Sequence, residues 1–357
     1  VLLAKHAGIQ VKMITGDYRR TAERIASNIG LLQNGEETLE GEELAQLNDE
    51  ELAKRIYPTA VFARIRPHDK LRIVNTLQKN GDITAMIGDG VNDAPALKQA
   101  NIGVVVGTAS DVAKETADLI LLDNNFRTIV AAIEEGRVIF ENIRKVVAYV
   151  LSNSFAEVLT IFISMILGWP APLLVAQILW IHLICDGPAD IVLGFEPKEN
   201  GIMDEKPKSL KEPILPPLGL FLIGVISIGS ALAALLIFGH YFKIHGDADE
   251  GRSLVFASLA INSLIYIFAY RSMRKSLFKM NSILKNKPLI FAVIFGMGLV
   301  FLPFVIPSLS QALGVVPLDL KQWLLIFTIA LMLLIAVEIG KAVSNWWHNK
   351  KNTLTKG

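Results

Sequence analysis

The chain has 357 residues, of which 52% are hydrophobic and 19% are charged, and its formal net charge is +1. This composition excludes a disordered protein and is poorer in charge than an ordinary soluble domain. The near-zero charge gives no overall field for nucleic acid, and the single cysteine, Cys185, excludes an intrachain disulfide and a cysteine-based zinc cluster.

Residues 1–125 have the pattern of a water-soluble α/β domain. Short apolar runs alternate with amphipathic stretches, which predicts a parallel sheet with crossover helices. The acidic stretch at 35–52 is interpreted as the solvated face of a helix. The predicted strands are 11–15, 60–63, 83–88, 102–106 and 119–122.

Two polar motifs follow predicted strands, at the edge where open α/β sheets bind ligands. The first is the run Thr15-Gly16-Asp17, and the second is the run GDGVND at 88–93. In the second run, Asp89 and Asp93 supply the hard oxygens that Mg²⁺ prefers. Lys70, after another strand, would add a positive charge beside a phosphate. Taken one by one, the first run can be an ordinary turn and Lys70 a solvated helix residue.

After residue 145 the chain becomes apolar. Six stretches of 17 to 23 residues are each long enough to cross a hydrocarbon core of about 30 Å as a helix. We therefore expect a helical stalk at 126–145, a six-helix membrane domain at 146–343 and a cytoplasmic tail at 344–357. The stretches are 146–167, 173–195, 218–238, 254–270, 289–306 and 323–339.

The connection 271–287 carries six Lys and Arg residues and no acid. By the positive-inside rule, this connection and the C-terminus are predicted to be cytoplasmic. Six crossings return the soluble domain to the same side, which makes the chain an integral, multi-pass membrane protein.

Carboxylates inside an apolar segment are costly and indicate a functional site. Glu157 lies midway along the first apolar segment, and the second contains His182, Asp186 and Asp190 at helical spacing. A cation shared between Glu157 and Asp186 is the functional interpretation, and a buried hydrogen-bonded network is the structural one. The Gly187-Pro188 pair is expected to break the second helix.

At this point the sequence resembles a known family. The run MITGD, Lys70 and the run GDGVNDAPALKQANIGVVVG are similar to the phosphorylation domain of P-type cation-transporting ATPases. The runs NSFAEVLTIF, AQILWIHLICDGPADIVLGFEP and IMDEKP extend the resemblance into the membrane segments, closest to the type II pumps that include calcium pumps. The resemblance implies an α/β haloacid dehalogenase-like (Rossmann-type) partial cytoplasmic domain, followed by an all-α membrane domain of six transmembrane helices.

The resemblance also implies roles for single residues. Thr15 would hydrogen-bond the phosphoryl group, with Gly16 and Asp17 close to the nucleotide, and Lys70 would neutralise the phosphoryl charge. The remaining implied residues are Asp89 and Asp93 at Mg²⁺, Asn92 and Asp93 completing the site, and Glu157, Asp186, Asn153, Ser154 and His182 at the transported cation.

Several parts of such a pump have no counterpart in this sequence. There is no DKTGT run, so the aspartate that accepts the phosphoryl group is missing, as are the nucleotide-binding and actuator domains and four membrane helices. Because the chain also starts at Val1, we expect a C-terminal part that works with the missing N-terminal part, ATP and Mg²⁺, and is inactive alone.

The cation pattern departs from that of calcium pumps. His182 and Cys185 replace Asn and Thr, Ser154 replaces Asn, and Asn262 and Ser263 lie where a Glu is expected. Ca²⁺ remains the favoured ion, and a pump for H⁺, Na⁺/K⁺ or Mn²⁺ is the alternative. A membrane-tethered phosphatase and a non-catalytic membrane regulator are the competing classes.

Overall fold

In the computed structural model, residues 1–123, 125–209, 212–273, 275–277 and 286–354 are described. The chain divides into two compact units, which are treated separately. Unit 1 comprises Val1–Arg137 with Glu199–Glu212, and unit 2 comprises Val138–Lys198 with Pro213–Gly357. The boundary thus falls at 137/138, inside the predicted stalk, and the segment Glu199–Glu212 belongs with the soluble part.

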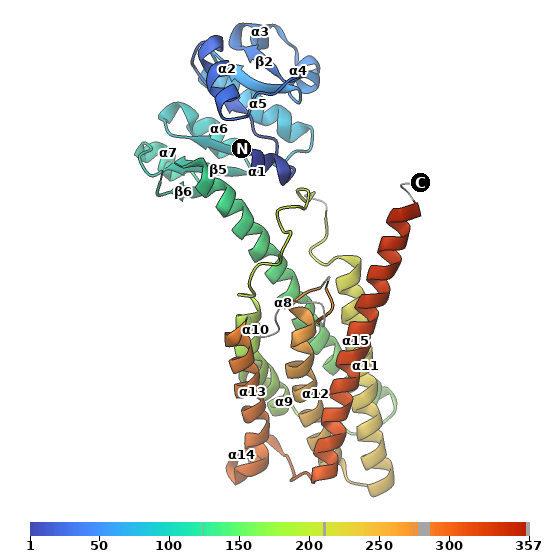
Figure 1. The fold of residues 1–357 in the computed structure, drawn as a ribbon. Helices are drawn as coiled ribbons and strands as arrows, with labels where there is room; N and C mark the ends of the chain where they lie inside the picture. Colours follow the sequence, from blue (N-terminus) through green and yellow to red (C-terminus); the bar gives the residue numbers. More distant parts are fainter. Residues whose placement is uncertain (124, 210–211, 274, 278–285, 355–357) are drawn as a thin grey trace. The chain divides into compact units, whose positions relative to one another are not determined.

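Unit 1 consists of short strands and helices, with a 3₁₀ turn at Val91–Asp93 (Figure 1). The sequence placed five of the six strands, with bounds that differ by up to two residues. In chain order the elements are α1 Leu2–His6, β1 Met13–Ile14, α2 Arg19–Asn28, β2 Glu37–Glu40, α3 Gly41–Gln46, α4 Asp49–Arg55, β3 Thr59–Ala63, α5 Pro67–Lys79, β4 Ala85–Gly88, α6 Ala94–Gln99, β5 Ile102–Val106, α7 Asp111–Thr116 and β6 Leu119–Leu121.

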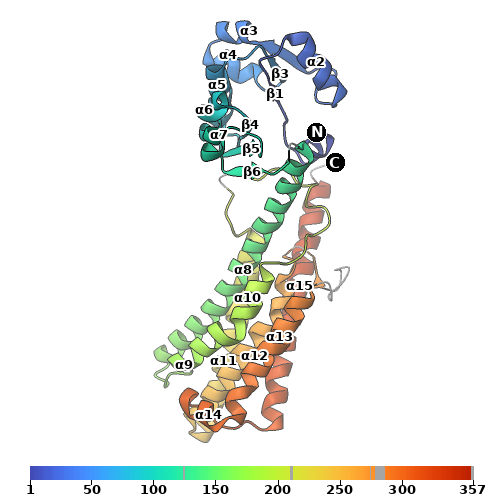
Figure 2. The same cartoon turned by 90° about the vertical axis from the view of Figure 1, so that its left-hand side faces the viewer.

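The strands form two parallel sheets of three rather than one sheet (Figure 2). Their orders are β1-β3-β2 and β4-β5-β6, so β1 and β4 are both edge strands. The strand β2 lies in the acidic stretch that we interpreted as a helix face, and that interpretation is wrong for Glu37–Glu40. Burial of Thr38 and Leu39 beside β3 outweighs the acidic residues at the two ends.

Helix α5 packs against both sheets. Ile73 joins the core formed with Phe62 of β3, and the adjacent Val74 joins the core formed with Met86 of β4. Consecutive positions on a helix point about 100° apart, so one helix presents a side chain to each core. This helix also carries Lys70.

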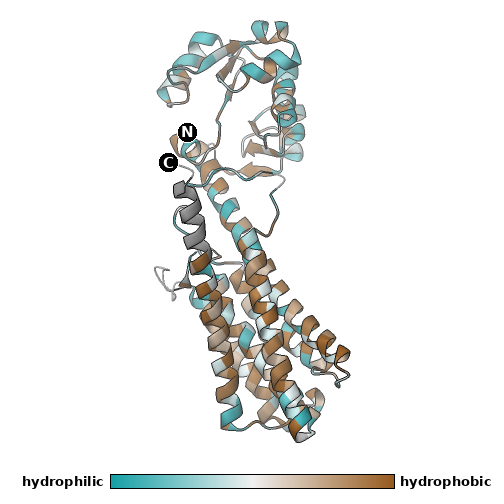
Figure 3. Ribbon diagram, turned by 90° about the vertical axis from the view of Figure 1, so that its right-hand side faces the viewer, coloured by the Kyte–Doolittle hydropathy of each residue, from teal (hydrophilic) through white to brown (hydrophobic). Residues whose placement is uncertain are grey.

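Unit 2 is helical, and hydrophobic residues predominate in its helices (Figure 3). In the described part of the chain, six helical spans are long and apolar enough to cross a membrane, which confirms the predicted number. Among the described residues the helices are α8 Phe126–Ile166, which begins in unit 1, α9 Val175–Leu179, a π-helical segment Trp180–Asp186, α10 Gly187–Leu193, α11 Pro217–His240, a π-helical turn Tyr241–His245, α12 Ala248–Tyr270, α13 Lys287–Val305, α14 Pro307–Leu313 and α15 Leu320–Leu354.

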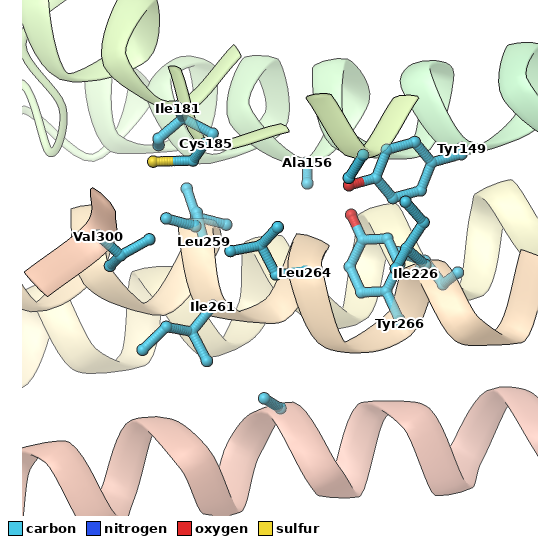
Figure 4. Packing of buried hydrophobic residues seen from close by; sticks show 14 of the residues in the cluster. Tyr149, Ala156, Ile181, Cys185, Ile226, Leu259, Ile261, Leu264, Tyr266 and Val300 are labelled. Carbon is cyan, nitrogen blue, oxygen red and sulfur yellow. The ribbon is translucent and has the colours of Figure 1, made fainter. Parts of the chain in front are cut away.

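The centre of unit 2 is α12, which contacts α11, α13 and α15 and is buried along nearly its whole length (Figure 4). Outward-facing residues such as Leu236 and Phe291 remain exposed, as expected where the surrounding solvent is lipid. Helix α12 is therefore the central helix of this unit, and the other helices pack around it.

One expectation about a helix end needs correction. Gly187-Pro188 does not break the second span, because the chain stays helical and changes from π to α geometry at Gly187. The wider π turn accommodates Pro188, which has no N–H to donate to the preceding turn. The last helix, α15, runs from Leu320 to Leu354.

Candidate functional site

The first polar motif forms a tight turn at the end of β1. Thr15 extends the ladder, because its N–H donates to the carbonyl oxygen of Phe62 at 2.9 Å. Its hydroxyl group donates to Asp17 Oδ2 at 3.0 Å and accepts from the Asp17 N–H at 3.1 Å. Gly16 and Asp17 are exposed, so the turn presents a carboxylate and the backbone of a glycine to solvent, beside the half-buried Thr15.

The second motif packs tightly after β4. Lys70 Nζ lies 2.5 Å from Asp93 Oδ1, and Asp93 is buried. The other oxygen, Oδ2, accepts a long hydrogen bond of 3.4 Å from the N–H of Asp89. Gly88 is needed here, because a Cβ atom at that position would lie 2.6 Å from Asp93 Cβ. Asp89 and Asn92 are exposed.

The structure therefore brings Lys70, Asp89 and Asp93 together and keeps Thr15 with Asp17. Among the contacts of the described residues, none joins the two sets. Within the residues that the structure describes, no group of three or more His, Cys, Asp or Glu side chains has the geometry of a metal site. Asp89 and Asp93 fit Mg²⁺ only together with phosphate oxygens, which is the usual way that this ion is held.

Asp186 is the most enclosed carboxylate of unit 2, with no exposed surface. Its Oδ1 accepts from Ser263 Oγ of α12 at 2.7 Å, and its Oδ2 accepts from Asn153 Nδ2 of α8 at 3.1 Å. The hydroxyl group of Tyr266, also on α12, donates to Asn153 Oδ1. Three helical elements thus meet at one carboxylate.

Glu157 has a separate partner. Its Oε2 lies 2.9 Å from His182 Nε2, and only 6% of Glu157 is exposed. Neither Glu157 nor Asp186 faces lipid, although no contact joins them directly within the described residues. Ser154 is half-buried and has no side-chain hydrogen bond in the structure.

Several buried oxygen atoms near this network have no hydrogen-bond partner among the described residues. They belong to Asp190, one turn beyond Asp186, to Asn262, adjacent to Ser263, and to Tyr149 of α8. Buried unpartnered oxygens are rare in proteins and each needs a reason. An oxygen-ligated cation is one chemistry that satisfies them.

Sequence reasoning missed the tyrosines. The rings of Tyr149 and Tyr266 lie 5.8 Å apart, and their hydroxyl groups point toward each other (Figure 4). Buried tyrosines usually place the hydroxyl against a polar partner. The spacing of Ser263 and Tyr266, one helical turn apart in a predominantly apolar span, was the signal available in the sequence.

Parts of the chain match known family models. Residues 1–101 match a model described as haloacid dehalogenase-like hydrolase, and a second model of that description matches residues 70–133. Residues 170–343 match a model described as cation transporting ATPase, C-terminus. A haloacid dehalogenase-like domain is thus combined with the membrane part of an ion-transport protein.

Curated relatives extend this match over most of the chain. It is 39% identical over 354 residues to calcium-transporting ATPase 1 of Bacillus cereus, covering 94% of this chain and 40% of the relative. For calcium-transporting ATPase of Bacillus subtilis the identity is 40% over 330 residues, covering 90% and 36%. For probable cation-transporting ATPase F of Mycobacterium bovis it is 36% over 338 residues, covering 93% and 37%. Over most of its length the chain is thus similar to cation-transporting ATPases, and it spans about two fifths of the length of the relatives that it matches.

Proposed function

We propose that this chain is the C-terminal part of an ATP-driven P-type cation pump, which couples aspartyl-phosphate formation and hydrolysis to cation movement. The observation that carries the proposal is Asp186, a carboxylate enclosed among membrane-spanning helices and held by oxygen- and nitrogen-bearing side chains of α8 and α12. Such a group is costly in a membrane unless a cation visits it.

At the phosphate end, the proposed work of this chain is binding and charge neutralisation. Thr15 donates its hydroxyl hydrogen to a phosphoryl oxygen in place of Asp17, and Lys70 supplies positive charge beside it. Asp89 and Asp93 hold Mg²⁺, which when bound neutralises negative charge on the phosphoryl oxygens. Asn92 is exposed next to these two residues, and its side-chain amide donates a hydrogen bond to the bound phosphoryl group.

The nucleophilic aspartate belongs in this proposal to a segment outside the chain. Both strands that carry the phosphate motifs, β1 and β4, are edge strands. An edge strand has unpaired N–H and C=O groups that accept a further strand. A strand added at either edge brings its own carboxyl end, and the residue that follows it, beside the motif.

At the membrane end, we propose that the cation is bound by Asp186, Glu157 and the neutral oxygens around them. Binding requires Glu157 to exchange its hydrogen bond with His182 for the cation, and requires the amide oxygen of Asn153 to turn from Tyr266. The relatives named calcium-transporting ATPase favour Ca²⁺ as the passenger. Two observations leave Mn²⁺, Na⁺/K⁺ and H⁺ as alternatives. His182 contacts Glu157, and one of the relatives is named only as a probable cation-transporting ATPase.

Glu157→Gln in the full-length pump tests this function. The substitution removes the charge and keeps the size, so we expect cation-dependent phosphorylation from ATP to be abolished, while phosphorylation from inorganic phosphate persists. Glu250→Gln, the same change at the start of α12, is the matched control. Normal cation activation of the Glu157 variant would refute the site, and cation-independent ATPase activity of the unaltered pump would refute the function.

We further propose that the connection 271–287 and the C-terminus face the cytoplasm, on the strength of the basic residues alone. The only cysteine, Cys185, is buried, so a new surface cysteine is selectively labelled. Lys275→Cys should react with a membrane-impermeant maleimide only from the cytoplasmic side, and Lys321→Cys only from the opposite side. The reverse pattern would overturn the orientation.

A further inference from the structure

A second buried ionic group lies in unit 2, away from the cation network. Glu196 follows α10, and its Oε1 accepts from Arg271 Nε at 2.9 Å and from Arg271 Nη2 at 2.7 Å. Its Oε2 accepts from Asn286 Nδ2 at 2.8 Å, and its main-chain carbonyl oxygen accepts from Asn142 Nδ2 at 2.8 Å. Every one of these side chains is at most 4% exposed.

The four residues join four helices, with Glu196 three residues beyond the end of α10. Asn142 is on α8, Arg271 ends α12, and Asn286 caps α13 by accepting from the N–H of Leu289. Glu196 is the acceptor for the other three. Burying this much polar and charged surface is not a stabilising choice in itself, since apolar side chains of similar volume often do as well or better. Its advantage is a fixed geometry between helices.

Three of these helical elements are the ones that hold Asp186. Asn153, which donates to Asp186, lies eleven positions beyond Asn142 on α8. Ser263, the other donor, lies eight positions before Arg271 on α12, about 12 Å along the helix. Asp186 itself lies ten positions before Glu196. The ionic group therefore closes the same three-helix unit about three turns away from the carboxylate.

We propose that Glu196 and Arg271 are positioning residues that fix the end of α10 to α12 and thereby set the cation affinity of Asp186; this inference rests on the proposed pump function. The hydrogen bonds at Asp186 are single contacts of 2.7 and 3.1 Å. They keep their length only if α10 does not slide or rotate against α12. The two hydrogen bonds from Arg271 to Glu196 Oε1 oppose that movement, because both donors and the acceptor are buried and charged.

The test is the cation concentration for half-maximal phosphorylation from ATP, K0.5, in the full-length pump carrying Glu196→Gln. Gln keeps the size of the side chain but loses the charge and half of its acceptor capacity. We expect K0.5 to rise about tenfold or more, the size found for groups that orient metal ligands. The level of phosphorylation from inorganic phosphate, which needs no cation, should stay unchanged.

Glu338→Gln is the matched control. Glu338 is 4% exposed and accepts from Lys341, Ser276 and the N–H of Leu277, so the same neutralisation removes a buried ion pair that contacts neither α8 nor α10. We expect lower thermal stability with an unchanged K0.5. Equal K0.5 values for the Glu196 and Glu338 variants would overturn the positioning role.

A milder variant covers the case in which Glu196→Gln does not fold. Asn286→Ser keeps a cap for α13 but is too short to reach Glu196. We expect a smaller rise in K0.5 in the same direction, and no rise would overturn the inference. An unaltered pump without any cation-dependent phosphorylation would refute the proposed function instead, so the two failures are distinguishable.

Discussion

Gly88 is a position at which unit 1 tolerates little change. A Cβ atom there would lie 2.6 Å from Asp93 Cβ and 2.7 Å from Asp93 Oδ2, well inside the roughly 3.5–4.0 Å at which carbon atoms pack best. Asp93 Cβ is attached to the backbone, so rotating the side chain cannot relieve the contact. Gly88→Ala must move the start of α6 by about 1 Å, which lengthens the contact between Lys70 and Asp93 from 2.5 Å to about 3.5 Å.

The expected loss follows from those distances. Overpacking of this kind costs about 1–3 kcal/mol, and at a urea dependence of about 2 kcal/mol per molar the midpoint of unfolding of unit 1 falls by about 1 M. A displacement of about 1 Å in a site also costs on the order of a hundredfold in rate, so we expect phosphoenzyme formation in the full-length pump to fall by that factor.

Gly90→Ala is the control, two residues further along. The nearest atom to a Cβ at Gly90 is the Asn92 nitrogen at 3.9 Å, and its backbone is extended, with φ −118°. Alanine there should be neutral or slightly stabilising. Pulse proteolysis of residues 1–137 in urea measures both variants. Equal midpoints for Gly88→Ala and Gly90→Ala would refute the argument from close packing.

Three further predictions address other contacts. Ser263→Ala removes the 2.7 Å hydrogen bond to Asp186, a contact to a charged group worth about 1.5–3 kcal/mol, and should raise the cation K0.5 about 10- to 100-fold in phosphorylation assays. Arg137→Gln removes donors to the carbonyl oxygens of residues 7, 202 and 205, and should increase tryptic cleavage within 199–212. Burial lowers the pKa of Lys12 to about 8 from 10.5. The unfolded chain therefore binds more protons between these values, and the free energy of unfolding of unit 1 should rise from pH 8 to 10; Lys12→Met should abolish that rise in pulse proteolysis.

Each of these predictions has a matched control. Ser258→Ala shortens another serine of α12 that makes no contact with Asp186, and Arg127→Gln and Lys54→Met alter exposed side chains of unit 1. Controls that change as much as the test variants would contradict the assigned contacts. A pH profile of unfolding that is flat or falls above pH 8 in the unaltered chain would contradict the effect of burying Lys12.

Much of the fold follows from local pattern. Runs of four or more apolar residues gave the strands 60–63 and 102–106, because a strand buried on both faces has no polar position. The six membrane spans follow from length and hydropathy. The strand Glu37–Glu40 was missed because its burial comes from β3, twenty residues away in sequence, and acidic residues at its ends resemble a helix start.

The residues of the candidate site stay predictions, and the contacts between them could not be predicted from the sequence. The pairing of Lys70 with Asp93, and of Glu157 with His182, joins positions 23 and 25 residues apart. No periodicity encodes such pairs, since they depend on how helices pack. The π-helical geometry at Trp180–Asp186 could not be predicted from the hydrophobic pattern either, because a π turn adds one residue without changing the apolar composition.

The free edges of β1 and β4 have a practical consequence. Unpaired backbone groups along a strand recruit any extended segment that meets them, including one from another copy. Produced by itself, the chain offers two such edges within a single small unit, and gentle detergent protects only its membrane helices. Co-producing the partner segment, rather than optimising the detergent, is the rational remedy for aggregation during purification.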